Sequence, residues 1–202
     1  MTASKTASTP CDGLVRLCHH RWLVPMIAQI GRLGGERVAS LTGALGASAP
    51  SVRRTLAAAR ELDLVMTNPG YGHPLRPEIL LTPWGEAVAR ECAGVVDAAR
   101  DLDHANLASR KWSLPVLAAL VGQRLRFSDL ALRLPDATPR SLALALRALV
   151  EAGLVERAAD AETLARPEYG LAPAAEALAR RAAALAAAAE FLGGGRRSTE
   201  DP

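Results

Sequence analysis

Apolar and polar residues follow one another along most of the chain with the three-to-four-residue spacing of amphipathic helices. In two places in each half of the chain this spacing gives way to short alternating runs near glycine and proline, which is the pattern of a β-hairpin. The first hairpin would turn through the Gly/Pro-rich segment 69–74. The elements predicted for the first half are helices near 13–18, 22–32, 38–45 and 50–62, strands near 64–68 and 78–82, and a long helix from Pro83 towards Leu107.

The chain also matches itself when it is shifted by 90 residues. So many coincidences at one offset indicate two copies of one domain, with a one-residue slip between the segments that begin at Val38 and Phe127. The matched segments, first copy against second, are Arg21-Trp22-x-x-Pro25 and Lys111-Trp112-x-x-Pro115, Glu61-x-x-Leu64-Val65 and Glu151-x-x-Leu154-Val155, Arg76-Pro77-Glu78 and Arg166-Pro167-Glu168, and Leu81-x-Pro83 and Leu171-x-Pro173.

The second copy repeats the order of elements found in the first. Three helices, a two-stranded hairpin and a final helix make up a winged helix-turn-helix, so the sequence predicts a mainly α fold with small β-hairpin wings and two such domains in tandem. The elements predicted for the second copy are helices near 112–121, 127–134 and 139–151, strands near 154–157 and 168–171, and a last helix over 173–192.

The long helix from Pro83 would finish the first domain and stand in for the first helix of the second, so no flexible linker is expected. The alanine-rich helix over 176–191 either packs against that long helix or brings two chains together. The predicted boundaries are a disordered N-terminus at 1–10, a first winged-helix domain at 11–100, a second at 101–192, and a disordered tail at 193–202.

The second copy contains a set of characteristic segments, which are Lys111-Trp112-Ser113-Leu114-Pro115, Arg126-Phe127-Ser128-Asp129-Leu130, Thr138-Pro139-Arg140, Gly153-Leu154-Val155-Glu156-Arg157 and Pro167-Glu168-Tyr169. With this set the second copy resembles the HxlR-type branch of the MarR-like winged-helix transcription regulators, and the first copy resembles it more weakly. The resemblance implies a bacterial DNA-binding repressor or activator whose partner is double-stranded DNA. Ordinary members are single domains that pair as dimers, so two joined copies look like an intramolecular pseudo-dimer, either monomeric or a homodimer.

In this fold the third helix of a domain enters the major groove of DNA and the hairpin lies along the backbone. In the helix over 50–62, the apolar positions Val52, Leu56 and Ala59 are predicted to face inward. Arginines on the outer face would reach guanine edges or phosphates, and hydroxyls would bind phosphate oxygens. The DNA-contact candidates of the first copy are Ser51, Arg53, Arg54 and Thr55 on the helix, with His73 and Arg76 on the wing; Arg76 could instead be held in the base of the hairpin.

The second copy has Ala143-Leu144-Ala145 where the first has Arg53-Arg54-Thr55. Only Arg140 and Arg147 remain basic on that helix, and the second wing carries Asp160 and Glu162, which would repel phosphate. We therefore expect the first domain to be the main DNA reader and the second recognition helix to be degenerate, with Arg140 as its remaining DNA-contact candidate.

An alternative reading is a repurposed winged-helix scaffold that binds a small apolar ligand or a protein partner, with little or no DNA binding. Trp22 and Trp112 could line a cavity between the halves, although a tryptophan at the start of this helix also suits the core. Whether a small-molecule effector exists is left open.

The overall charge does not decide between these readings. Lys+Arg 24 and Asp+Glu 21 give a net charge of only +3, so a pI near 9.0 reveals little about nucleic-acid binding. What matters is where the arginines lie.

Other chemistry has few candidates. Some regulators of the type that this chain resembles sense oxidants or electrophiles through a cysteine just before the first helix, so the resemblance implies Cys11 as a candidate sensing thiol. The three cysteines have no metal-like spacing. No metal, cofactor or enzymatic activity is expected, because no nucleotide-binding or catalytic motif is present. With no apolar run long enough to span a membrane and no secretory signal, the sequence predicts a cytoplasmic protein.

Overall fold

The computed structural model describes residues 11–70, 78–158 and 167–192. Helices dominate these residues, and each half of the chain adds a small antiparallel sheet, so the predicted mainly helical fold with small hairpins is confirmed. The elements of the first half are α1 (Asp12–His19), α2 (Leu23–Leu33), β1 (Glu36–Arg37), α3 (Val38–Leu45), α4 (Ala49–Glu61), β2 (Val65–Thr67), β3 (Glu78–Leu81) and α5 (Pro83–Asp101). Those of the second half are η1 (Ala105–Ser109), α6 (Ser113–Ala119), β4 (Leu125–Arg126), α7 (Phe127–Arg133), α8 (Pro139–Glu151), β5 (Val155–Ala158), β6 (Glu168–Leu171), η2 (Pro173–Ala175), α9 (Glu176–Ala188) and η3 (Glu190–Leu192).

The two sheets have the same topology. Each has three strands, in the order β1-β3-β2 in the first half and β4-β6-β5 in the second. Val65 pairs with Leu81 and Val155 with Leu171, so the strand register also repeats at an offset of 90 residues. The third strands, β1 and β4, are absent from the predicted two-stranded hairpins, because two residues are too short to give an alternating pattern.

The turn after the third helix repeats as well. The N–H of Leu64 donates to the carbonyl of Ala59 at 2.8 Å, and that of Leu154 to the carbonyl of Leu149 at 2.9 Å. Each turn needs one residue with a positive φ, which is Asp63 at 55° in the first half and Gly153 at 67° in the second. The same turn therefore contains an aspartate, which disfavours a positive φ, in the first half and a glycine, which adopts it readily, in the second.

The long helix from Pro83 is shorter than predicted. Helix α5 ends at Asp101, where Asp103 takes a positive φ of 58° and the N–H of His104 donates to the carbonyl of Ala99. A separate 3-10 helix, η1, follows it. The prediction that one helix continues to Leu107 and replaces the first helix of the second domain is wrong, because the left-handed turn at Asp103 redirects the chain.

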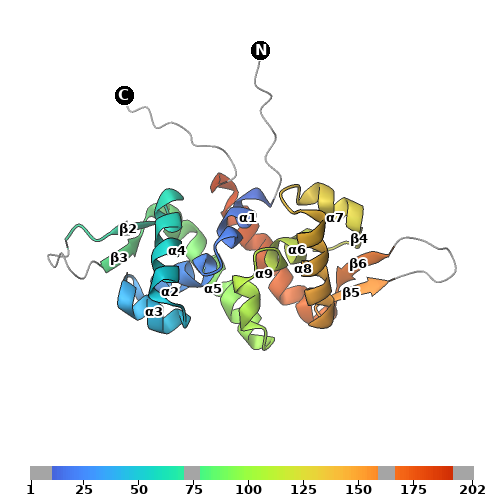
Figure 1. Cartoon of the computed structure of the whole chain (residues 1–202), viewed down its shortest axis with the longest axis horizontal. Helices are drawn as coiled ribbons and strands as arrows, with labels where there is room; N and C mark the ends of the chain where they lie inside the picture. The colour runs from blue at the N-terminus through green and yellow to red at the C-terminus, as the bar shows by residue number, and fades with distance from the viewer. Residues whose placement is uncertain (1–10, 71–77, 159–166, 193–202) are drawn as a thin grey trace, which may run out of the picture.

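The two halves meet through α5 and α9, which pack against each other at the centre of the molecule (Figure 1). Helix α2 covers α5, and α6 covers α9. One continuous cluster of buried apolar side chains runs through both halves. Of the two roles predicted for the alanine-rich helix, the structure therefore shows packing against α5 within the same chain.

Helix α1 ties the N-terminal end of the described chain to the second half, since it packs against α9, η3 and α6 (Figure 1). This contact depends on Gly13. A Cβ built there would lie 1.9 Å from the carbonyl oxygen of Ala189, so only glycine lets the two backbones approach so closely.

A second close approach distinguishes the halves. A Cβ on Gly85 would lie 2.0 Å from the carbonyl oxygen of Leu64, and the glycine allows α5 to begin directly at Pro83. The position 90 residues later is Ala175, and there the chain forms the 3-10 turn η2 before α9 begins.

The hairpins extend from opposite ends of the molecule, while α4 and α8 both lie at the front of the view in Figure 1. In this view α3, α4 and their hairpin lie on the left, and α7, α8 and theirs lie on the right. Among the helices of the described ranges, none is long and apolar enough to cross a membrane.

Candidate nucleic-acid interface

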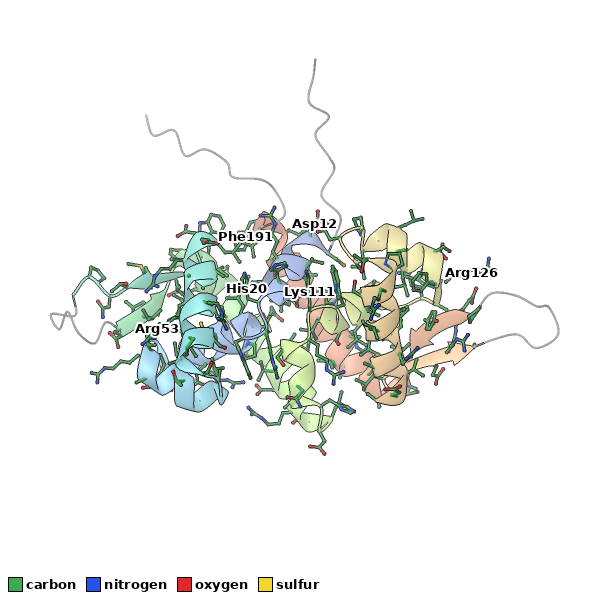
Figure 2. All side chains as sticks on the ribbon, in the orientation of Figure 1. Asp12, His20, Arg53, Lys111, Arg126 and Phe191 are labelled. Carbon is green, nitrogen blue, oxygen red and sulfur yellow. The ribbon has the colours of Figure 1, made fainter. Side chains whose placement is uncertain are left out.

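Helix α4 exposes part of the surface predicted for DNA contact. Val52, Leu56 and Ala59 are buried, as their spacing predicts, and Arg53 and Arg54 are exposed on the opposite side. Figure 2 labels Arg53 on α4, near the end of the molecule away from Arg126. The side chain of Arg53 forms no hydrogen bond or ion pair with the described residues, so its charge is available to an external anion.

The predicted outward position of Thr55 is wrong. Its side chain is only 4% exposed, and its hydroxyl donates to the carbonyl of Ser51 at 2.9 Å. Ala58, on the same side of α4 as Thr55, is buried too. Because α4 packs against α3 as well as α2, its buried arc is wider than the spacing of its large apolar residues indicates.

Ser51 lies half-buried in the first turn of α4, within a short chain of polar contacts. Arg54 donates to its hydroxyl at 3.3 Å, and the hydroxyl of Ser48 lies 3.0 Å from it. Ser48 occupies the N-cap position of α4, but its side chain accepts no backbone N–H. The first-turn amides of α4 therefore have no side-chain cap at the positive end of the helix dipole, where anions bind favourably.

Helix α8 starts differently. The hydroxyl of Thr138 accepts the N–H of Ser141 at 3.2 Å, so this helix end is already capped. Arg140 is exposed and has no partner among the described residues. Further along the outer face, Ala143 is exposed and Leu144 is 53% exposed, in place of the two arginines of α4.

Two arginines at or next to strand β4 are paired with carboxylates of the same half. Arg124 lies 3.5 Å from Glu156, and Arg126 lies 3.5 Å from Glu168, so these charges are at least partly neutralised. The wing candidates His73 and Arg76, and the acidic segment with Asp160 and Glu162, lie outside the described residues. So do the segments 1–10 and 193–202, for which disorder was predicted.

The tryptophan pair occupies equivalent places in the two halves. The guanidinium of Arg21 lies 4.8 Å from the ring centre of Trp22, and the ammonium of Lys111 lies 5.0 Å from that of Trp112. Trp112 is 8% exposed, and Trp22 packs against the core. Three surface pockets on the described residues are lined by other side chains, so the predicted ligand role of the tryptophans gains no support from them.

The cysteines are buried. Burial, reinforced by the nearby charge of Asp12, raises the pKa of the Cys11 thiol, although Arg133 opposes the shift. Burial raises the pKa of Cys18 to about 12 and that of Cys92 further. Reactive thiols instead have a low pKa and are accessible, so the surroundings of Cys11 disfavour the predicted sensing role. In the described part of the chain, no three His, Cys, Asp or Glu side chains are grouped to hold a metal ion.

The sequence indicated Arg147 only as a remaining basic residue of its helix and gave no role to Arg157, but the fold brings the two together. Arg157 on β5 and Arg147 on α8 line one groove, about 460 Å³ in volume. Their separation in sequence gives no sign of this proximity, which arises because β5 returns alongside α8.

Comparison with known protein families finds a match over the second half of the chain. Residues 107–192 match a family model described as HxlR-like helix-turn-helix, from within η1 to the end of η3. The match supports an HxlR-type helix-turn-helix regulator and indicates DNA-binding transcription regulation as the class of function. Proteins of this family are regulators and are not typically enzymes. No curated protein matches the chain.

Proposed function

We propose that the protein is a sequence-specific DNA-binding transcription regulator in which two tandem winged-helix domains, at 11–100 and 101–192, form an intramolecular pseudo-dimer. The first domain is the main DNA reader, and α8 of the second is degenerate as a reader. Double-stranded DNA is the partner.

The observation that carries this proposal is the outer face of α4. It presents two adjacent exposed arginines with no carboxylate partner among the described residues, beside an N-terminus without a side-chain cap. Arginine forks bind guanine edges and phosphates in pairs of hydrogen bonds, and free helix amides bind phosphate. The equivalent face of α8 is apolar and its N-terminus is capped, which supports a larger contribution to DNA binding from the first domain than from the second.

The placement of α4 and α8 on one face supports a role for both domains in positioning the protein on DNA (Figure 1). A single winged-helix head makes few contacts, and two heads about one helical turn apart add affinity and fix orientation. In a fused pair the two DNA-binding heads can differ in sequence, whereas the two heads of a homodimer are identical.

The proposal is tested by selecting bound duplexes of about 30 base pairs from a random pool, long enough for two half-sites. Binding of the selected duplex is then measured by gel shift for the wild type, for Arg53→Ala/Arg54→Ala and for the matched control Arg140→Ala/Arg147→Ala. We expect the first variant to bind the duplex at least a hundredfold more weakly than the wild type. The slope of log affinity against log salt concentration should also become shallower by about two, since each phosphate contact contributes about 0.9 to that slope.

The control variant should lose less than about fivefold, since the first domain carries most of the binding. Equal losses in the two variants would contradict the asymmetry. Failure of the wild type to select any duplex would contradict DNA binding itself.

A further inference from the structure

The second half carries a groove between α8 and the hairpin, which we call the α8 groove. It is about 460 Å³ in volume, which falls in the range of small-molecule sites. Its apolar walls come from three elements: α7, α8 and β6. The apolar and aromatic side chains that line it are Phe127, Ala143, Leu146, Val150 and Tyr169.

The α8 groove is rich in aromatic surface for this chain. The whole sequence holds 3 Trp, 2 Tyr and 2 Phe, seven aromatic residues, and two of them line this one groove. Both Phe127 and Tyr169 are only half-buried, so part of each ring remains open to a ligand. The phenol hydroxyl of Tyr169 has no hydrogen-bond partner among the described residues. Flat apolar molecules pack well against such rings.

The charge of the groove favours an anion. Arg147 and Arg157 both line it, and neither forms an ion pair or hydrogen bond with a described residue. The neighbouring Arg124 and Arg126, in contrast, are paired with carboxylates. With Glu151 as the third charged residue of the lining, the groove has a net charge of 2 − 1 = +1, which suits a ligand with one negative charge.

The first half has no equivalent chemistry at these positions. By the sequence offset, Val38 and Ile79 replace the two aromatic residues, and Ala57 and Thr67 replace the two arginines. The aromatic rings and the unpaired arginines therefore occur together in the half whose outer helix face has no adjacent arginines. Retention of a DNA-binding surface does not require the aromatic pair, whereas a ligand site uses both features.

We propose that the α8 groove binds a small, flat, apolar molecule with a single carboxylate. The rings of Phe127 and Tyr169 pack against its body, and Arg147 and Arg157 bind its carboxylate. This site does not depend on DNA binding by the first half, so each proposal can fail without the other.

The test uses the full chain and two probes of matched shape, 2-naphthoate and the neutral 2-naphthylmethanol, by isothermal titration calorimetry. We expect one site per chain and at least tenfold tighter binding of the anion. The substitutions Phe127→Val and Tyr169→Ile introduce the residues that the first half has at these positions, so the backbone should accommodate them. We expect this double variant to bind both probes at least tenfold more weakly. Arg147→Ala/Arg157→Thr should weaken 2-naphthoate at least tenfold and leave 2-naphthylmethanol within twofold.

Leu132→Ala is the control, since Leu132 is 77% exposed and does not line the groove. It should leave both probes unchanged, and thermal melts check that every variant folds. Equal affinity for the two probes, or equal loss in the control, would overturn the proposal. So would an Arg147→Ala/Arg157→Thr variant that loses DNA retention but keeps 2-naphthoate affinity, because the arginines would then serve phosphates of DNA.

Discussion

The two halves of the chain have nearly the same backbone but present different surfaces to solvent. Their sheets share order and register, and Ala47 and Ala137 are both 7% exposed at the same point before the third helix. The outer faces of α4 and α8 differ in charge, in apolar exposure and in capping. Packing and turn geometry thus constrain the buried positions, while exposed positions can change with little effect on the fold.

The family match lies on the half whose third helix, α8, lacks the adjacent exposed arginines of α4. Residues such as Trp112, Leu130 and Leu154 are buried in this half and are part of the sequence pattern that resembles the family. Similarity to a family therefore reports a shared scaffold more directly than it reports the residues that touch a ligand.

The largest stability difference between the halves is expected at the start of α5. Gly85→Ala places a Cβ against the carbonyl of Leu64, so the first turn must rearrange towards the 3-10 form of η2. We expect the free energy of unfolding to fall by about 2 kcal/mol, measured from urea denaturation.

The reciprocal change, Ala175→Gly, removes only one methyl group and should cost about 1 kcal/mol or less. An unchanged urea midpoint for Gly85→Ala would mean that α5 adopts the turn of the second half without cost, and that the glycine is not required there.

A surface graft should reduce the functional difference between the halves. In the Arg53→Ala/Arg54→Ala variant, the further substitutions Ala143→Arg/Leu144→Arg give α8 the two arginines that α4 has lost. We expect at least a tenfold gain in affinity for the selected duplex by gel shift, equivalent to about 1.4 kcal/mol, because the new guanidinium groups face the same way as those removed.

Added charge alone could raise non-specific binding, so the control places two arginines elsewhere, as Ala184→Arg/Ala187→Arg on exposed positions of α9. An equal gain in this control would show that net charge, and not the position of the arginines, accounts for the rescue.

The smallest expected difference concerns the turn after the third helix. Asp63 holds a positive φ that Gly153 adopts without strain. Gly153→Asp should lower the free energy of unfolding by about 1 kcal/mol, and Asp63→Gly should raise it by about 0.5 kcal/mol after the greater freedom of glycine in the unfolded chain is included. Urea denaturation checks both, and effects of the same sign would contradict the expected equivalence of the turns.

Much of the fold could be predicted from the sequence because its signals are local. Amphipathic spacing located α2, α4 and α8 to within one or two residues, and the 90-residue offset anticipated the shared strand register. The exposed arginines of α4 were also predictable, since their position opposite Val52 and Leu56 follows from helical geometry alone.

The remaining features depended on contacts between distant segments. The burial of Thr55 comes from α3 packing beside α4, and the end of α5 comes from the left-handed turn at Asp103. The strands β1 and β4 form only because β3 and β6 offer them a partner edge. Short elements and wide buried arcs have too little sequence signal of their own to be recognised in advance.

The sequence by itself determined the main helices, the β2–β3 and β5–β6 hairpins, their order and the exposed arginines of α4, because helix and strand periodicity act over a few residues. Only the tertiary structure decided that α9 packs against α5 within one chain and that Arg147 and Arg157 meet at one groove with Phe127 and Tyr169. Those arrangements depend on how separate elements bury their apolar faces together, and no local pattern specifies that choice.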